Sequence, residues 1–69
     1  MTIDFDSTPF GVTISHAEHV GPRLYRAEGT IFHRDTGGNV HRVVGTGSVR
    51  TAAEDAAIRE ARAWAVRHV

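Results

Sequence analysis

The sequence predicts an α+β fold, in which a three-stranded antiparallel meander carries one C-terminal helix packed on one face (βββα). Three observations predict it. Apolar residues alternate from Phe10 onward, two longer strand-like runs at 24–34 and 40–50 flank the turn-forming stretch DTGGN, and an alanine-rich run of helical period closes the chain. With 69 residues the chain has the size of one domain, so we expect residues 1–9 to form an N-terminal arm and residues 10–69 a single domain.

The N-terminal segment MTIDFDSTP has no clear period, and for this reason we expect an arm, with Ile3 and Phe5 as its apolar anchors. The first strand follows at 10–14, where every second residue is a large apolar one. The stretch HVGPR at 19–23 then ends it, since a Gly-Pro pair interrupts strands.

The two longer strands are expected to form a hairpin with a definite register. A loop of Thr36, Gly37 and Gly38 provides a glycine free to take positive φ and places Asp35 opposite Asn39. The pairs on one side are then Ile31 with Val43, Gly29 with Gly45, Ala27 with Gly47, and Tyr25 with Val49. The pairs on the other side are Phe32 with Arg42, Thr30 with Val44, Glu28 with Thr46, and Arg26 with Ser48. A two-residue Gly-Gly turn would shift the register by one residue and mix the two faces, so we predict the three-residue loop.

The C-terminal run predicts a helix over 52–67. The stretch TAAE is a capping box, in which Thr51 caps the helix and Glu54 bonds back to the cap N–H. The residues at helical spacing on the inner stripe are Ala53, Ala57, Ile58, Ala61, Trp64 and Ala65.

The Gly-x-Gly within VVGTGSVRTAAEDAA (43–57) is predicted to be structural. Glycine and alanine at 27, 29, 45 and 47 would face the alanine stripe, so that helix and sheet lie close and form dispersion contacts without large side chains. A phosphate-binding loop needs its glycine turn to open the helix directly. Here residues 48–51 separate Gly47 from the helix, and Arg50 stands where a third glycine would be needed.

Composition excludes several classes of function. Eight basic and eight acidic residues leave no net charge, so bulk attraction does not favour nucleic acid. The chain has no cysteine, hence no disulfide and no thiolate metal site, and no apolar run approaches the ~20 residues of a membrane span. Every basic residue is arginine and alanine is abundant, which is typical of a GC-rich bacterial genome. We therefore expect a bacterial, cytoplasmic protein with no membrane partner.

The candidates for chemistry are few. Ser48 has no paired base and acid, so we expect no enzymatic activity and no cofactor. Since the helix should run back antiparallel to the last strand, His33, His41 and His68 could converge near the hairpin and bind zinc or nickel. Alternatively, these imidazoles cap the open end of the core as neutral or half-exposed side chains.

The sheet face that the helix leaves uncovered is the predicted binding surface. Its contact residues are Arg26, Phe32, Arg42 and Arg50. Arginine beside an exposed aromatic ring is typical of protein interfaces and of single-stranded nucleic-acid platforms. We predict a non-enzymatic interaction module that binds a protein partner or a second copy of itself, with nucleic acid as the alternative. A third possibility is a solvated face, partly covered by the arm through Ile3 and Phe5.

Two resemblances concern the segment around the helix. The stretch 25–65 resembles the second half of a double-stranded-RNA-binding domain, where two strands lead through a Gly-x-Gly-x-Ser-like segment into an alanine-rich helix, as GTGSVRTAAEDAAIREARAWA does. This implies the same arrangement of sheet and helix and a duplex-RNA partner. The positions that match the family's lysine cluster at the start of that helix are Thr51, Ala52, Glu54 and Asp55.

The helix opening RTAAEDAAIREARAWA is also similar to the C-terminal helix of HicB-like antitoxin domains, which implies a toxin protein as partner. The order of elements further resembles the three-stranded DNA-binding domains of integrases and AP2-type factors. That resemblance implies DNA contacts through a basic, aromatic sheet face, for which Arg26, Phe32 and Arg42 are the nearest equivalents.

Overall fold

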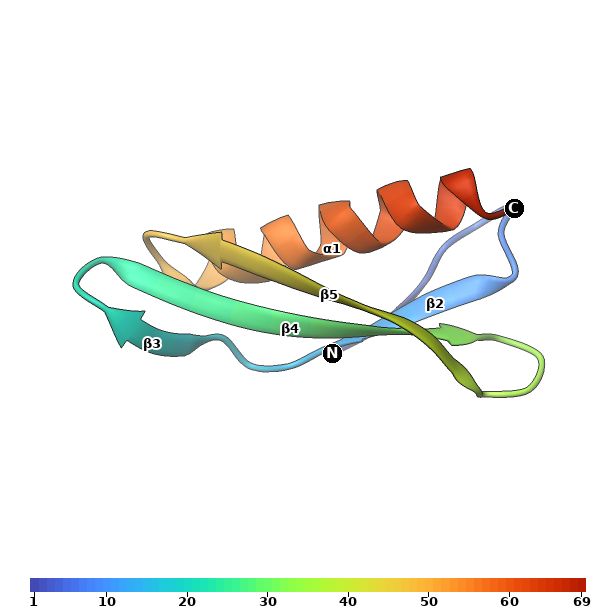
Figure 1. Ribbon diagram of the computed structural model, residues 1–69, viewed down its shortest axis with the longest axis horizontal. Helices are drawn as coiled ribbons and strands as arrows, with labels where there is room; N and C mark the ends of the chain where they lie inside the picture. Colours follow the sequence, from blue (N-terminus) through green and yellow to red (C-terminus); the bar gives the residue numbers. More distant parts are fainter.

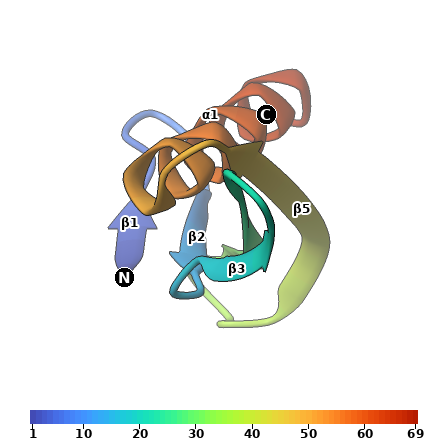
Figure 2. The same cartoon turned by 90° about the vertical axis from the view of Figure 1, so that its left-hand side faces the viewer.

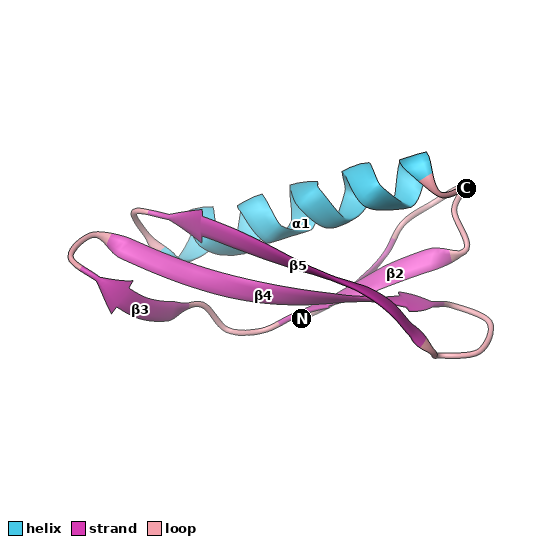
Figure 3. Ribbon diagram, in the orientation of Figure 1, coloured by secondary structure: helices cyan, strands magenta, loops and turns pink.

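A computed structural model describes residues 1–69 and shows an antiparallel sheet with one C-terminal helix (Figures 1 and 3). The α+β class is therefore confirmed, but the sheet has five strands rather than three. The elements are β1 (Thr2–Asp4), β2 (Phe10–Ile14), β3 (Glu18–Gly21), β4 (Leu24–His33), β5 (Asn39–Gly47) and α1 (Arg50–Arg67).

The long strand β4 organises the sheet. On one edge it pairs with β5 along most of its length, and on the other edge it pairs with β2 through its second half and with β3 through its first. β1 pairs with the outer side of β2. Figure 2, which looks along the molecule, shows β1 and β5 at opposite edges, with α1 covering one face.

The segment 1–9, predicted as an arm, is part of this sheet. Ile3 pairs with Val12 and packs against the core, and the side chain of Phe5 is only 3% exposed. Both side chains lie on the side of the sheet that faces the helix, so they do not cover the other face. The arm prediction is wrong because the alternation in residues 2–4 is too short to distinguish a strand from coil.

The stretch HVGPR also forms structure instead of only ending a strand. Glu18, His19 and Gly21 pair with β4, and Pro22 and Arg23 make the turn into that strand. Arg23 has a φ of 52°, in the left-handed region where a side chain is disfavoured.

The β4–β5 register differs from the predicted one by two residues. Ala27 pairs with Gly45 and Gly29 with Val43. The hairpin loop closes through bonds between His33 and residues 37 and 38, with Gly37 at a φ of +76°, and a bulge at residue 40 absorbs one residue of β5. A shift of two residues leaves each side chain on its predicted face. The faces were therefore predicted correctly although the partners were not.

The start of α1 contradicts the predicted capping box. Val49 is the N-cap residue and no side chain caps the helix. The carboxylate of Glu54 instead accepts a hydrogen bond from Ala17 N at 3.0 Å, while Arg50 Nε donates to Ala17 O at 3.1 Å. Because Arg50 and Glu54 lie one turn apart, together they bind both backbone groups of Ala17, in the segment between β2 and β3.

The contact between helix and sheet is as close as the small residues predict. A Cβ added at Gly45 would lie 2.2 Å from Ala57 N and 2.3 Å from Ala53 O. Gly47 is similarly restricted by the backbone of residues 52 and 53. The alanines Ala53, Ala57, Ala61 and Ala65 are completely buried, and Ile58 and Trp64 pack at the sides, which confirms the predicted inner stripe. α1 lacks the apolar length that a membrane crossing requires.

Candidate interaction surface

The face of the sheet opposite α1 carries polar rows that run across the strands. Thr2, Thr13, Thr30 and Arg42 form one such row, from β1 to β5. The neighbouring row places Glu28 beside Val44. We call this side the open face, because no element of the chain packs on it (Figure 2).

Two of the predicted contact residues, Arg26 and Arg42, lie on the open face and share one acidic partner. Arg26 Nη1 is 2.7 Å from Glu28 Oε1, and Arg42 Nη2 bonds the other carboxylate oxygen. The hydrogen bond and charge of Arg26, reinforced by the charge of Arg42, hold the pKa of Glu28 below its usual value. One of the two positive charges is therefore neutralised, while the Arg42 side chain stays 71% exposed.

Phe32, the third predicted contact residue, also lies on this face but already has a structural role. Its ring lies over the bare backbone of Gly11, where an added Cβ would be 2.6 Å from Phe32 Cζ. An aromatic ring that covers a cross-strand glycine replaces packing that the glycine lacks. The ring is half-buried, so only part of its surface is open to a partner.

Arg50 does not belong to this surface. It begins α1 on the opposite side of the sheet, where it bonds Ala17 O and its guanidinium carbon lies 5.4 Å from the centre of the Tyr25 ring. The prediction extended the last strand to residue 50, whereas β5 ends at Gly47. Arg50 stabilises the contact between the helix and the β2–β3 segment, and the prediction that it lies on the open face is wrong.

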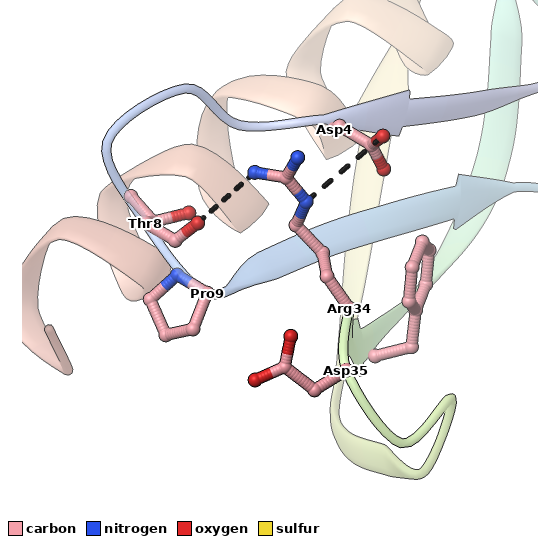
Figure 4. Close-up of a pocket in the computed structure, with 6 residues that line it drawn as sticks. Asp4, Thr8, Pro9, Arg34 and Asp35 are labelled. Atoms are coloured by element: carbon pink, nitrogen blue, oxygen red, sulfur yellow. Dashed lines mark hydrogen bonds and ion pairs between the residues drawn. The ribbon is translucent and has the colours of Figure 1, made fainter.

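A shallow depression of about 400 Å³ lies beside Phe32, at the end of the open face (Figure 4). It is lined mainly by polar side chains from the end of β1, the β1–β2 loop and the two residues that follow β4. Arg34 crosses it, donating to Thr8 O at 3.2 Å and approaching Asp4 Oδ2 at 4.0 Å. These contacts hold the β1–β2 loop against the segment that follows β4, so Arg34 has a structural role.

The three candidate metal ligands contact aromatic rings and do not point toward a common metal position. The imidazoles of His41 and His68 stack on the indole of Trp64, with ring centroids 5.1 and 4.0 Å away, and His33 meets Phe10 edge-on. No group of three histidine or acidic side chains lies together as a ligand set. The chain therefore does not bring His33, His41 and His68 together for zinc or nickel.

The feature that the sequence interpretation missed is the outer edge of β5. Ser15 N donates to Glu28 O, and Glu28 N donates to the Ser15 hydroxyl, so the backbone groups of Glu28 point away from β5. Backbone direction alternates along a strand, so the odd-numbered residues of β4 bond to the odd-numbered residues of β5. The N–H and C=O groups of Arg42, Val44 and Thr46 consequently point outward from an edge that no other strand occupies.

This edge has few of the features that usually prevent strands from pairing. β5 is nine residues long and contains neither proline nor lysine. Its bulge lies at the hairpin end, so the ladder is regular from His41 to Gly47. Val44 is 44% exposed and adds an apolar side chain next to Arg42.

Comparison of the chain with protein-family models, curated proteins and solved structures finds no match. The resemblances to double-stranded-RNA-binding, HicB-like and integrase or AP2-type domains therefore stay predictions.

Proposed function

We propose that this chain is a non-enzymatic interaction module that binds protein by strand addition at the outer edge of β5. The observation that carries the proposal is the row of outward-directed backbone groups of Arg42, Val44 and Thr46. An extended segment that pairs there gains main-chain hydrogen bonds, and its alternate side chains reach the open face. Arg42 and Val44 would then supply the side-chain contacts.

Protein is favoured over nucleic acid by the charges of the open face. Glu28 binds both Arg26 and Arg42, and Arg50 lies elsewhere, so the basic row that would bind phosphates is reduced to a single excess positive charge. Affinity for nucleic acid rises with the number of phosphates that lysine and arginine neutralise. The half-buried ring of Phe32 also offers little stacking surface.

Site-specific photo-crosslinking tests the proposal in living cells. A photoreactive phenylalanine analogue is placed at Val44 and, as a matched control, at Val20, an exposed valine of β3 on the other side of β4. We expect a discrete protein adduct from position 44 and none from position 20. The absence of an adduct from position 44, or equal adducts from both positions, would contradict strand addition at β5.

Titration of labelled RNA and DNA at two salt concentrations tests the alternative. A nucleic-acid complex should weaken by orders of magnitude between low and moderate salt. We expect no saturable binding at moderate salt. Specific binding that disappears in both Arg26→Ala and Arg42→Ala variants would replace the protein proposal with a nucleic-acid function.

A further inference from the structure

We infer that the occupant of the β5 edge is a second copy of this chain, paired antiparallel so that the two Val43 residues meet on a two-fold axis. This inference rests on the proposed function, which leaves open what binds the edge. The pairing would join the two sheets into one, with both helices on the same face. Arg42 of each copy would lie opposite Val44 of the other and exchange both backbone hydrogen bonds with it, since these are the residues whose groups point outward.

The charges on the open face select this register from its neighbours. Centred on Val43, each Arg42 shares a row with Val44 and Glu28 of the second copy, because Val44 and Glu28 pair within one chain. Moving the centre to Val44 would align Arg42 with Thr46 and Arg26 of the second copy, two like charges. Moving it to Arg42 would set the two arginines directly opposite each other, which is destabilising. Of these three registers, only the one centred on Val43 places Glu28 of each copy in a row with an arginine of the second copy.

The position of α1 leaves room for a second helix. Gly45 of β5 lies under the backbone of α1, and Ala27, its partner on β4, is completely buried, so the helix lies over both strands. With the axis of α1 midway between β4 and β5, the two helices of the joined sheet would be separated by two strand spacings, or about 9.6 Å. Helices pack at about 8–10 Å. At that separation the two-fold pair would bring them into contact without overlap.

The side of α1 above the β5 edge carries three alanines together with Glu60. Ala56 and Ala52 are the helix residues closest to Gly45 and Gly47 on that side. Glu60, one turn after Ala56, and Ala63 continue the same side. Ala52 and Ala56 are half-buried and Ala63 is exposed. Small side chains let helix backbones come close and form dispersion contacts, as the same helix does with the sheet.

Light scattering at high micromolar protein concentration measures the oligomeric state and so tests the predicted dimer. We expect the mass of two chains for the natural protein, and the mass of one chain for Val44→Lys. The introduced cation would lie opposite Arg42 of the second copy, and the axis repeats this repulsion, so dimerisation should weaken about tenfold or more. Within one chain the same cation lies beside Glu28, so the fold is preserved. Val20→Lys is the matched control and should remain dimeric; a monomeric natural protein would overturn the inference.

Cysteine variants test the register, because the chain has no cysteine of its own. On the axis, two Val43→Cys residues would form a non-hydrogen-bonded pair with Cα atoms about 4.5 Å apart, within disulfide range. Two Val44→Cys residues would be diagonal neighbours about 8 Å apart, beyond that range. We expect mild oxidation to form a disulfide between two Val43→Cys chains. We also expect a disulfide in an equal mixture of Arg42→Cys and Val44→Cys chains, but none in Val44→Cys alone. Efficient joining of Val44→Cys alone would overturn this register.

The two proposals can fail separately. If the chain is monomeric but position 44 crosslinks a different protein, the second-copy inference is wrong and strand addition stands. If the chain is monomeric and position 44 crosslinks nothing, both are wrong.

Discussion

The two faces of the sheet are stabilised in different ways. On the helix face, alanines pack against glycine backbone and no charged group is buried. On the open face, Glu28 is bonded to two arginines at the surface, among threonines. Close backbone packing tolerates no added atom, whereas exposed ion pairs contribute little to the free energy of unfolding. Substitutions on the open face can therefore test binding without unfolding the protein.

The largest effect is expected for Gly45→Ala. The added methyl would meet backbone atoms of α1 on two sides, and neither the strand nor the helix can move without losing the alanine contacts. We expect the free energy of unfolding to fall by at least about 3 kcal/mol, at the upper end of overpacking effects. Thermal unfolding followed by circular dichroism measures it.

The matched control is Gly38→Ala, in the hairpin loop. Its nearest atom outside the flanking residues is the Thr36 hydroxyl oxygen at 3.4 Å, so its stability should change by less than about 0.5 kcal/mol. Equal melting of the natural protein and Gly45→Ala would contradict the close packing of α1 on β5.

An intermediate effect is expected for Glu54→Ala. The substitution leaves the N–H of Ala17, a buried residue, without its partner, which costs about 1–3 kcal/mol. Thr51→Ala should cost less than about 0.5 kcal/mol, because Thr51 makes no capping bond. Chemical denaturation of both variants gives the comparison. A larger loss of stability in Thr51→Ala than in Glu54→Ala would instead support the predicted capping box.

The features predicted correctly from the sequence are those determined by nearby residues. Alternation placed β2, and the side-chain faces of β4 and β5 followed from the period of two. Close packing of α1 on β5 was predicted from the glycines at 45 and 47 and from the alanine stripe. The prediction was possible because small residues, which close packing requires, occur in both the strand and the helix. The bulge at residue 40 and the strands β1 and β3 depend on pairing with β4, for which short segments carry no local signal.

The candidate interaction surface was predicted less completely, because it depends on which strand edge has backbone groups that no other strand of the chain pairs with. Arg26 and Arg42 lie on the open face, as their position in the strand pattern requires. The free edge could not be identified before the order of the strands was known, since any of them could have covered β5. The roles of Arg50 and Glu54 could not be predicted for the same reason, because their partner is the backbone of Ala17, more than thirty residues away.

The smallest effect is expected for Glu28→Gln on the open face, and it should depend on pH. The arginines lower the pKa of Glu28 in the folded chain, so its ionised form stabilises the fold. This contribution is complete above the pKa of the unfolded chain and disappears as the pH falls through the lower folded value. Glu28→Gln should thus be slightly less stable than the natural protein at neutral pH and equal to it in acid. A difference that grew on acidification would show that the arginines do not stabilise the carboxylate. If the open face also supports pairing between copies, Glu28→Gln should weaken dimerisation at neutral pH more than it weakens folding.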